Sequence, residues 1–226
     1  GCMTAFFLAK DHVKVTIVER DAIGSQASGG AAGLLTPYWG PIDKTIAAFS
    51  QENLRLHAIL HKELGEYTKI NYHYGTIPFL RLAFSERDES SLMRWYNDRK
   101  KEHLTAEWLS NNEVRRLTPW VGNAIQSAVL SNIEPQVDAY TLTIAVAEAA
   151  EHYGAKITTG EVKNLLTTGS KVRGIHLSDG TRLQADHVVL AMGPWSRFLG
   201  SWIGFDVPVK PQKGQIIYLD SPHEHP

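Results

Sequence analysis

The sequence predicts an α/β fold with a parallel sheet, and three features carry that prediction. Residues 2–10 are small and apolar with the spacing of a helix. Residues 13–19 are β-branched and almost continuously apolar, as in a buried parallel strand. Residues 161–193 alternate short apolar runs with turn residues, including an Asp-Gly pair, which is typical of antiparallel hairpins. We therefore expect a parallel α/β layer joined to a small antiparallel sheet.

The composition is that of an ordinary globular protein. The chain has 226 residues, of which 43% are hydrophobic and 21% charged, enough for one large core or two interleaved subdomains. A formal net charge of −1 gives no electrostatic reason to expect nucleic acid as a partner. The single cysteine, Cys2, excludes an internal disulfide framework and fits a reducing, cytoplasmic compartment. No apolar run approaches the roughly 20 residues of a membrane span, while peripheral membrane association and the oligomeric state stay open.

The first residues form half of a dinucleotide-binding motif. A helix followed by a buried strand is the second half of a βαβ unit, in which the carboxyl end of the strand faces the ligand crevice. Gly1 matches the last glycine of the fingerprint, and Glu19 stands where an acid binds the adenosine ribose. The alternative for Glu19 is a solvated strand terminus. Because the chain begins inside this motif and ends just after a strand, we expect it to be a fragment.

A loop of small residues follows the strand. Residues 24–37 contain four glycines, several alanines and two serines, so the backbone can lie directly against a ligand. The alternative is a flexible linker. The two leucines and the proline that end the loop argue against a linker, and we interpret the loop as part of the binding site.

The clearest amphipathic helix is predicted over residues 42–67, with Gly65 as its C-cap. His57 and His61 have the i, i+4 spacing of a metal pair, but no third ligand accompanies them, and we expect no metal site. The apolar side of this helix is expected to comprise Ile46, Phe49, Leu54, Leu56, Leu60 and Leu64.

The remaining elements are predicted from shorter patterns. Ser110 and Glu113 form a capping box that starts a short helix. The other expected elements are two short strands over 70–85, a charged helix over 86–104 with Leu92, Trp95 and Tyr96 inward, a strand over 124–132, a helix and strand over 137–160, and an apolar strand over 187–193.

Several of these segments resemble one protein family. VTIVER, the small-residue loop ending in GLLTP, the strand HVVLAMGPW and the segment VPVKPQKGQ are similar to FAD-dependent oxidoreductases of the D-amino-acid oxidase type, in the glycine oxidase and D-amino-acid dehydrogenase branch. The resemblance implies a Rossmann-like FAD-binding domain with a β-meander, interleaved with an incomplete α+β substrate domain. It assigns residues 1–75 and 136–205 to the FAD-binding domain and residues 76–135 and 206–226 to the substrate domain.

The resemblance also implies which residues bind FAD. Glu19 and Arg20 are expected beside the adenosine, and the backbone of Val162 beside the adenine. The full set of expected cofactor-binding residues is Gly1, Glu19, Arg20, Ala27, Ser28, Ala32, Gly33, Leu34, Val162 and Gly193. The catalytic residues are unknown, because the resemblance places the substrate-binding arginine and tyrosine beyond residue 226.

The activity implied by the resemblance is oxidation of an amino acid or a secondary amine. A hydride passes from the amine-bearing carbon to flavin N5, and the imine that forms is hydrolysed. The electron acceptor is expected to be oxygen or a quinone. Three alternatives stay open: a flavin dehydrogenase of a hydroxy acid or glycerol phosphate, a non-catalytic FAD-binding subunit of a hetero-oligomeric oxidase, and a truncated product that does not fold independently.

Overall fold

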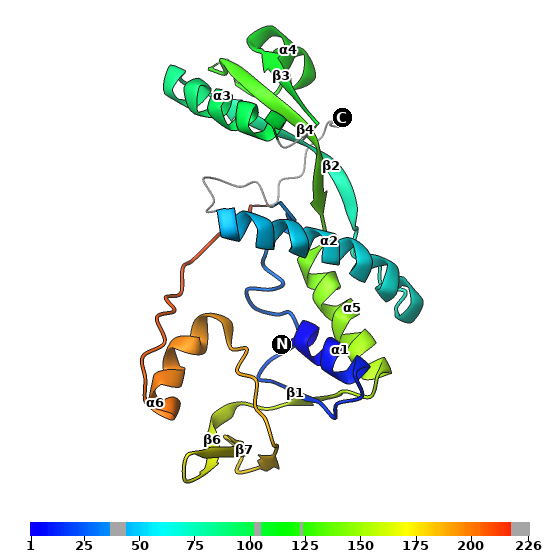
Figure 1. The fold of residues 1–226 in the computed structure, drawn as a ribbon, viewed down its shortest axis with the longest axis vertical. Helices are drawn as coiled ribbons and strands as arrows, with labels where there is room; N and C mark the ends of the chain where they lie inside the picture. Colours follow the sequence, from blue (N-terminus) through cyan, green and yellow to red (C-terminus); the bar gives the residue numbers. More distant parts are fainter. Residues whose placement is uncertain (37–43, 102–104, 123, 218–226) are drawn as a thin grey trace. The chain divides into compact units, whose positions relative to one another are not determined.

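The computed structural model describes residues 1–36, 44–101, 105–122 and 124–217 (Figure 1). The chain forms two compact units. Unit 1 comprises Gly1–Ala32, Leu60–Tyr72 and Asp138–Pro226, and unit 2 comprises Gly33–Ile59 and His73–Val137. Helix α2 (Lys44–Tyr67) begins in unit 2 and ends in unit 1. No helix of the described residues combines the length and the apolar character that crossing a membrane requires.

Unit 1 is built on the predicted parallel pair of strands. Strand β1 (Thr16–Glu19) pairs in parallel with β5 (Lys156–Thr159), and helices α1 (Cys2–Lys10) and α5 (Ala139–His152) precede these strands. The two helices pack against each other. Their buried positions are mostly alanines, which allow close approach, together with Phe6 and Val146. The carboxylate of Asp138 caps α5 by accepting the Thr141 N–H at 2.7 Å.

The rest of unit 1 is an antiparallel meander and a short helical segment. Strands β6 (Val162–Thr168), β7 (Lys171–Leu177) and β8 (Arg182–Gln184) form a sheet in that order, as the alternating pattern predicted. A 3₁₀ helix η1 (Gly193–Leu199) and helix α6 (Gly200–Ile203) follow.

Unit 2 is a three-stranded antiparallel sheet covered by helices. The strand order is β2 (Gly75–Ala83), β4 (Ser127–Gln136) and β3 (Ala106–Ser110). Helix α3 (Glu86–Lys101) packs on one core cluster through Leu92, Trp95 and Tyr96, the three inner residues that the pattern predicted. Helix α4 (Asn111–Leu117) starts with the predicted capping box, in which the Ser110 N–H donates to the Glu113 carboxylate at 2.7 Å.

The structure corrects several predictions about elements. Residues 70–85 contain one strand, β2 (Gly75–Ala83), rather than two. A register shift between Ile77 and Phe79 places an irregularity at Pro78, which has no N–H to donate. Gly65 does not end α2, which continues to Tyr67. The centroid of the Tyr67 ring lies 5.1 Å from that of the Tyr153 ring. Strand β3 was not predicted at all.

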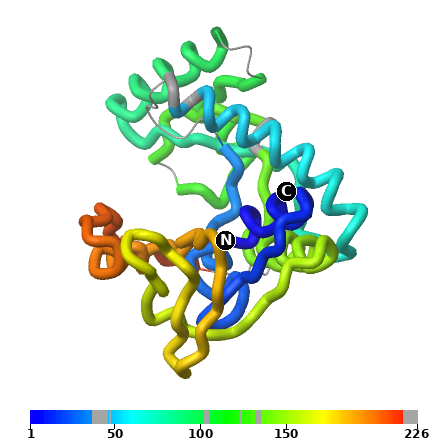
Figure 2. Tube along the Cα trace, turned by 60° about the horizontal axis from the view of Figure 1, so that its bottom comes forward, coloured from blue at the N-terminus to red at the C-terminus, as the bar shows by residue number. Residues whose placement is uncertain are grey.

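The apolar side of α2 was predicted correctly only at its end. Leu60 and Leu64 are buried, but Ile46, Phe49 and Leu56 are 57%, 68% and 44% exposed. The predicted strand over 187–193 is also absent, because no strand of the described residues pairs with it. This segment instead passes the N-terminus, where a Cβ added to Gly1 would lie 3.7 Å from that of Ala191 (Figure 2).

Candidate nucleotide-binding site

The start of α1 and the carboxyl end of β1 lie together in unit 1. Gly1 is the N-cap of α1, and Glu19 is the last residue of β1. Burial raises the pKa of the Cys2 thiol above its ordinary value, and the negative charge of Glu19 adds to that increase. Helix α1 contacts strand β1, as in the second half of a βαβ unit.

Glu19 is oriented with one oxygen engaged and the other open. Its Oε1 accepts the backbone N–H of Asp21 at 3.0 Å, and its carbonyl accepts the N–H of Gly160 at 2.8 Å. Within the described part of the chain, Oε2 accepts no hydrogen bond from the protein. A carboxylate held in this way can accept hydrogen bonds from ribose hydroxyls.

The residues that follow Glu19 form a hydrogen-bond network that the sequence did not reveal. Asp21 Oδ2 accepts hydrogen bonds from Arg20 Nε at 3.2 Å, from Arg20 Nη2 at 3.1 Å and from Gln26 Nε2 at 3.1 Å. Asp21 therefore ties Arg20 to the small-residue loop. Local sequence gave no signal for it, because a single Asp after a strand is a common turn residue.

Trp195 is a second residue that sequence reasoning missed. It lies in η1, and the Arg20 guanidinium carbon is 4.9 Å from its ring centroid. The tryptophan belongs to the segment HVVLAMGPW, which resembles the family, but nothing in the sequence pairs it with a residue far earlier in the chain.

Gly193 lies just before Trp195, at the start of η1. Its φ is +51°, a left-handed conformation that side chains other than glycine adopt at a cost. An added Cβ would have open space around it. The backbone conformation, rather than crowding, therefore calls for glycine at this position.

The small-residue loop is folded against α5. A Cβ added to Gly29 would lie 2.0 Å from the carbonyl oxygen of Gly24 and 2.9 Å from the Tyr140 ring, so only glycine fits. Ala27 and Ser28, the predicted binding residues of this loop, are both exposed. Such close packing favours a built part of a site over the flexible linker that was the alternative.

Two more predicted residues of unit 1 are placed by the backbone. Val162 is the first residue of β6 and pairs with Leu177. Val162 comes two residues after Gly160, whose N–H donates a hydrogen bond to the Glu19 carbonyl. Ala32 is exposed and is the last residue of the first segment of unit 1.

Gly33 and Leu34 belong to unit 2. The Gly33 carbonyl accepts the Val137 N–H at 2.9 Å, and Leu34 forms an isolated antiparallel bridge with Gln136. Within unit 1 the structure places Gly1 beside Ala191 and Arg20 against Trp195, so that Glu19 and Gly193 are within two residues of these contacts along the chain. Ala27, Ser28 and Val162 lie on connected segments of the same unit. The structure holds Gly33 and Leu34 on the sheet of unit 2.

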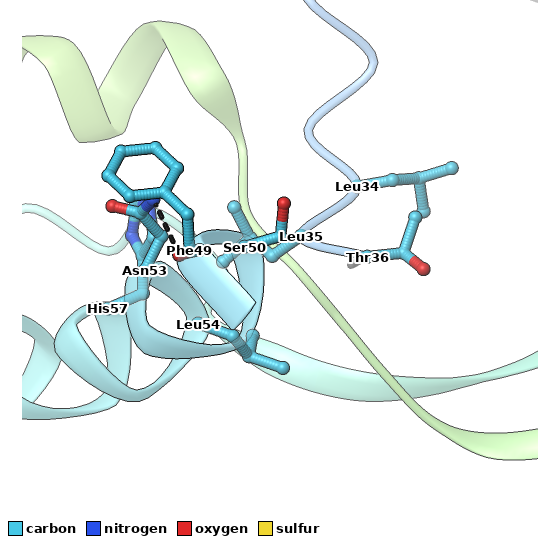
Figure 3. A pocket seen from close by; sticks show the side chains of 8 residues that line it. All are labelled: Leu34, Leu35, Thr36, Phe49, Ser50, Asn53, Leu54 and His57. Carbon is cyan, nitrogen blue, oxygen red and sulfur yellow. Dashed lines mark hydrogen bonds between the residues drawn. The ribbon is translucent and has the colours of Figure 1, made fainter. Parts of the chain in front are cut away.

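Unit 2 also contains an open pocket of about 230 Å³, shown in Figure 3. No lining residue carries a fixed charge. Burial lowers the pKa of His57, which favours its neutral form. The pocket therefore offers no counter-charge for a carboxylate. Its lining comprises Leu34, Leu35 and Thr36 on the extended segment, and Phe49, Ser50, Asn53, Leu54 and His57 on α2.

The donor set of unit 1 fits a nucleotide. The N-terminal end of α1 offers backbone N–H groups to a phosphate, and Glu19 offers an open carboxylate oxygen. The loop around Gly29 has no bulky side chain at this position, so its backbone can approach a ligand. Among the described residues, no three His, Cys, Asp or Glu side chains gather as they would around a metal ion. His61 instead contacts the Tyr72 hydroxyl at 2.7 Å through Nδ1.

A sequence model of the family described as FAD dependent oxidoreductase (DAO) matches residues 1–226. The chain belongs to this FAD-dependent oxidoreductase family. The predicted resemblance and the predicted FAD cofactor of the family are thereby confirmed.

Individual members of the family agree with this assignment. Glycine oxidase from Bacillus licheniformis is 29% identical over 220 residues, covering 96% of this chain and 58% of the relative. The crystal structure of glycine oxidase from Geobacillus kaustophilus matches with a TM-score of 0.82 and 28% identity, over 90% of this chain and 55% of that one. Anaerobic glycerol-3-phosphate dehydrogenase subunit A1 from Haloferax volcanii is 30% identical over an alignment of 234 positions that covers 95% of this chain and 38% of the relative.

These members of the FAD-dependent oxidoreductase family also bear on the fold. The likeness to the glycine oxidase structure confirms the predicted Rossmann-like α/β class. The chain spans little more than half the length of the glycine oxidases it matches.

Proposed function

We propose that this chain forms the FAD-binding part of an enzyme that oxidises an amino acid or a secondary amine. The observation that carries the proposal is that Gly1 lies beside Ala191, while Arg20, the neighbour of Glu19 in the chain, lies against Trp195, in a chain that matches the FAD-dependent family along its whole length. Similarity to glycine oxidases supports an amine as the substrate rather than an unrelated group.

The proposed roles of the residues follow from their chemistry. The start of α1 binds phosphate, Glu19 binds the ribose hydroxyls, and the small-residue loop lies against the cofactor. We extend the proposal to the FAD-binding domain over 1–75 and 136–205 and the partial substrate domain over 76–135 and 206–226. The proposed binding set is Gly1, Glu19, Arg20, Ala27, Ser28, Ala32, Gly33, Leu34, Val162 and Gly193.

The reaction removes two electrons from the amine-bearing carbon. The C–H bond breaks with its electron pair, the nitrogen loses a proton, and a C=N double bond forms; water then hydrolyses this imine to a carbonyl product and an amine. Bound FAD supplies the two-electron acceptor. The final electron acceptor would be oxygen or a quinone. We assign no general base, and a cytoplasmic location is part of the proposal.

The proposal is tested first by the absorbance spectrum of the purified protein with added FAD. We expect bound flavin bands that remain after desalting, and their absence would contradict FAD binding. Anaerobic addition of glycine, sarcosine, proline and D-amino acids then tests the substrate class. Loss of the oxidised flavin bands with at least one amine is expected.

A second candidate is oxidation of glycerol phosphate or a hydroxy acid. It is favoured by the 30% identity to the glycerol-3-phosphate dehydrogenase subunit. Bleaching by glycerol 3-phosphate but by no amine would support it over amine oxidation. Bound flavin that no substrate bleaches would instead favour a non-catalytic FAD-binding subunit.

A further inference from the structure

Arg20 is fixed in place by a single carboxylate oxygen. Asp21 Oδ2 receives two hydrogen bonds from the guanidinium and one from Gln26. The Arg20 and Asp21 side chains are 40% and 46% exposed, and an exposed ion pair of this kind adds little to stability. Its consequence is orientation, because two hydrogen bonds from the guanidinium to Asp21 Oδ2 restrict where the guanidinium can lie, and the third, from Gln26, holds that oxygen.

The oriented guanidinium lies against an aromatic ring. Its Cζ atom is 4.9 Å from the Trp195 ring centroid, within the range of a cation–π contact. Trp195 is half-buried and follows the left-handed Gly193, whose conformation starts the 3₁₀ helix on which the ring stands. Two planar groups from distant parts of the chain therefore stand together.

Hydrogen bonds and the cation–π contact connect these planar groups to Glu19, the residue proposed to bind the ribose. The Asp21 N–H donates to Glu19 Oε1, and the Asp21 carboxylate holds Arg20 against Trp195. The chain of contacts thus runs from the carboxylate that would bind ribose to a guanidinium and an indole ring. Guanidinium and indole planes are groups on which a purine base can stack.

We propose that Arg20 and Trp195 form a wall beside the adenosine half of the cofactor, with Asp21 and Gln26 as positioning residues that hold Arg20 in that wall. The proposal rests on the proposed function, because it requires FAD at the Glu19 end of unit 1. It adds Trp195, Asp21 and Gln26 to the residues that determine cofactor affinity.

Calorimetric titration with separate halves of the cofactor tests the wall. The ligands are FAD, ADP and FMN, and the variants are Arg20→Ala, Trp195→Ala and Asp21→Asn. We expect the affinity for FAD and ADP to fall about 3- to 30-fold in the two alanine variants, the range of a cation–π contact. The affinity for FMN, which has no adenosine, is expected to stay unchanged.

Two further variants separate recognition from folding. Arg197→Ala is the matched control, because Arg197 is an exposed arginine of the same 3₁₀ helix whose guanidinium lies 5.0 Å from the Phe198 ring instead. It should leave ADP affinity unchanged. Trp195→Phe keeps an aromatic face and should bind ADP with most of the wild-type affinity. It also tests the wall if Trp195→Ala does not fold.

The outcomes are distinguishable. Two results would overturn the adenosine wall while leaving FAD binding intact. One is an equal loss of affinity for ADP and for FMN in the alanine variants. The other is an ADP affinity that stays at the wild-type value in Arg20→Ala, Trp195→Ala and Trp195→Phe. A wild-type protein that binds neither FAD nor ADP would instead overturn the proposed function itself.

Discussion

The two ends of helix α1 differ in kind. From its middle to its last turn the helix is packed: the centroid of the Phe6 ring lies 5.8 Å from that of Tyr153, and Lys10 forms an ion pair with Glu63. Its first turn lies beside Gly1, the open Glu19 carboxylate and the Gly29 loop. In parallel α/β layers, ligands bind at the carboxyl ends of the strands. One end of unit 1 is therefore packed into the core, and we propose that the other end binds the cofactor.

The packed end is reinforced by hydrogen bonds between aromatic residues. A hydrogen bond with Tyr153 raises the pKa of Tyr67 to about 12, and the Tyr67 ring also contacts His152 at a centroid distance of 4.9 Å. The comparison predicts that substitutions at the two ends affect different properties, stability at one end and cofactor affinity at the other.

The largest expected effect is on stability at the packed end. Phe6 is 0% exposed, so Phe6→Ala should lower the free energy of unfolding by about 3–5 kcal/mol. Phe7→Ala is the control, because Phe7 is 46% exposed. Denaturant unfolding measures both. Equal costs for the two variants would contradict the assignment of this end to the core.

The next effect is on cofactor affinity at the open end. Glu19→Ala should weaken FAD binding about 10- to 100-fold, the range for hydrogen bonds to a charged group. It should change the unfolding midpoint little. Glu151→Ala, an exposed position in the last turns of α5, provides the control. FAD affinity that is the same in both variants would remove Glu19 from the site.

A smaller effect is expected from the loop. Gly29→Ala places a Cβ 2.0 Å from the Gly24 carbonyl oxygen and should distort the loop, lowering FAD affinity several-fold. Gly30→Ala is a close control, because its Cβ would come no nearer than 3.6 Å to another atom. Flavin fluorescence titration compares them. A greater loss in Gly30→Ala would show that the loop does not pack as described.

The smallest effect concerns the Cys2 thiol. Because burial, with Glu19 adding to it, raises the pKa of this thiol, its contribution to stability is present below the ordinary cysteine pKa and lost as pH rises through the raised value. Glu19→Gln removes the negative charge and should move the alkylation midpoint to lower pH. Iodoacetamide labelling of Cys2 across pH measures this shift. A midpoint that does not move would separate Cys2 from Glu19.

The sequence was sufficient where local patterns determine the structure. The apolar run before Glu19 predicted β1, the Ser110 and Glu113 pair predicted the start of α4, and the Asp-Gly turn predicted the hairpin of β7 and β8. Each depends on residues close together in the chain, so periodicity and capping chemistry describe it well.

The sequence was insufficient where distant segments meet. The contact between Arg20 and Trp195 depends on how η1 returns to the end of β1, which no local pattern encodes. The run over 187–193 is apolar enough for a strand but needs a paired neighbour, which the described residues do not provide. The apolar positions of α2 likewise predict a buried face, although Phe49 is exposed.

The central claim is that FAD binds at the Glu19 end of unit 1. Hydrogen exchange measured by mass spectrometry, with and without FAD, tests it most directly. We predict slower exchange in peptides covering residues 19–30 and 191–195, with no change in peptides covering residues 148–155. Protection confined to the Tyr153 end, or no protection in either region while FAD is bound, would contradict the account.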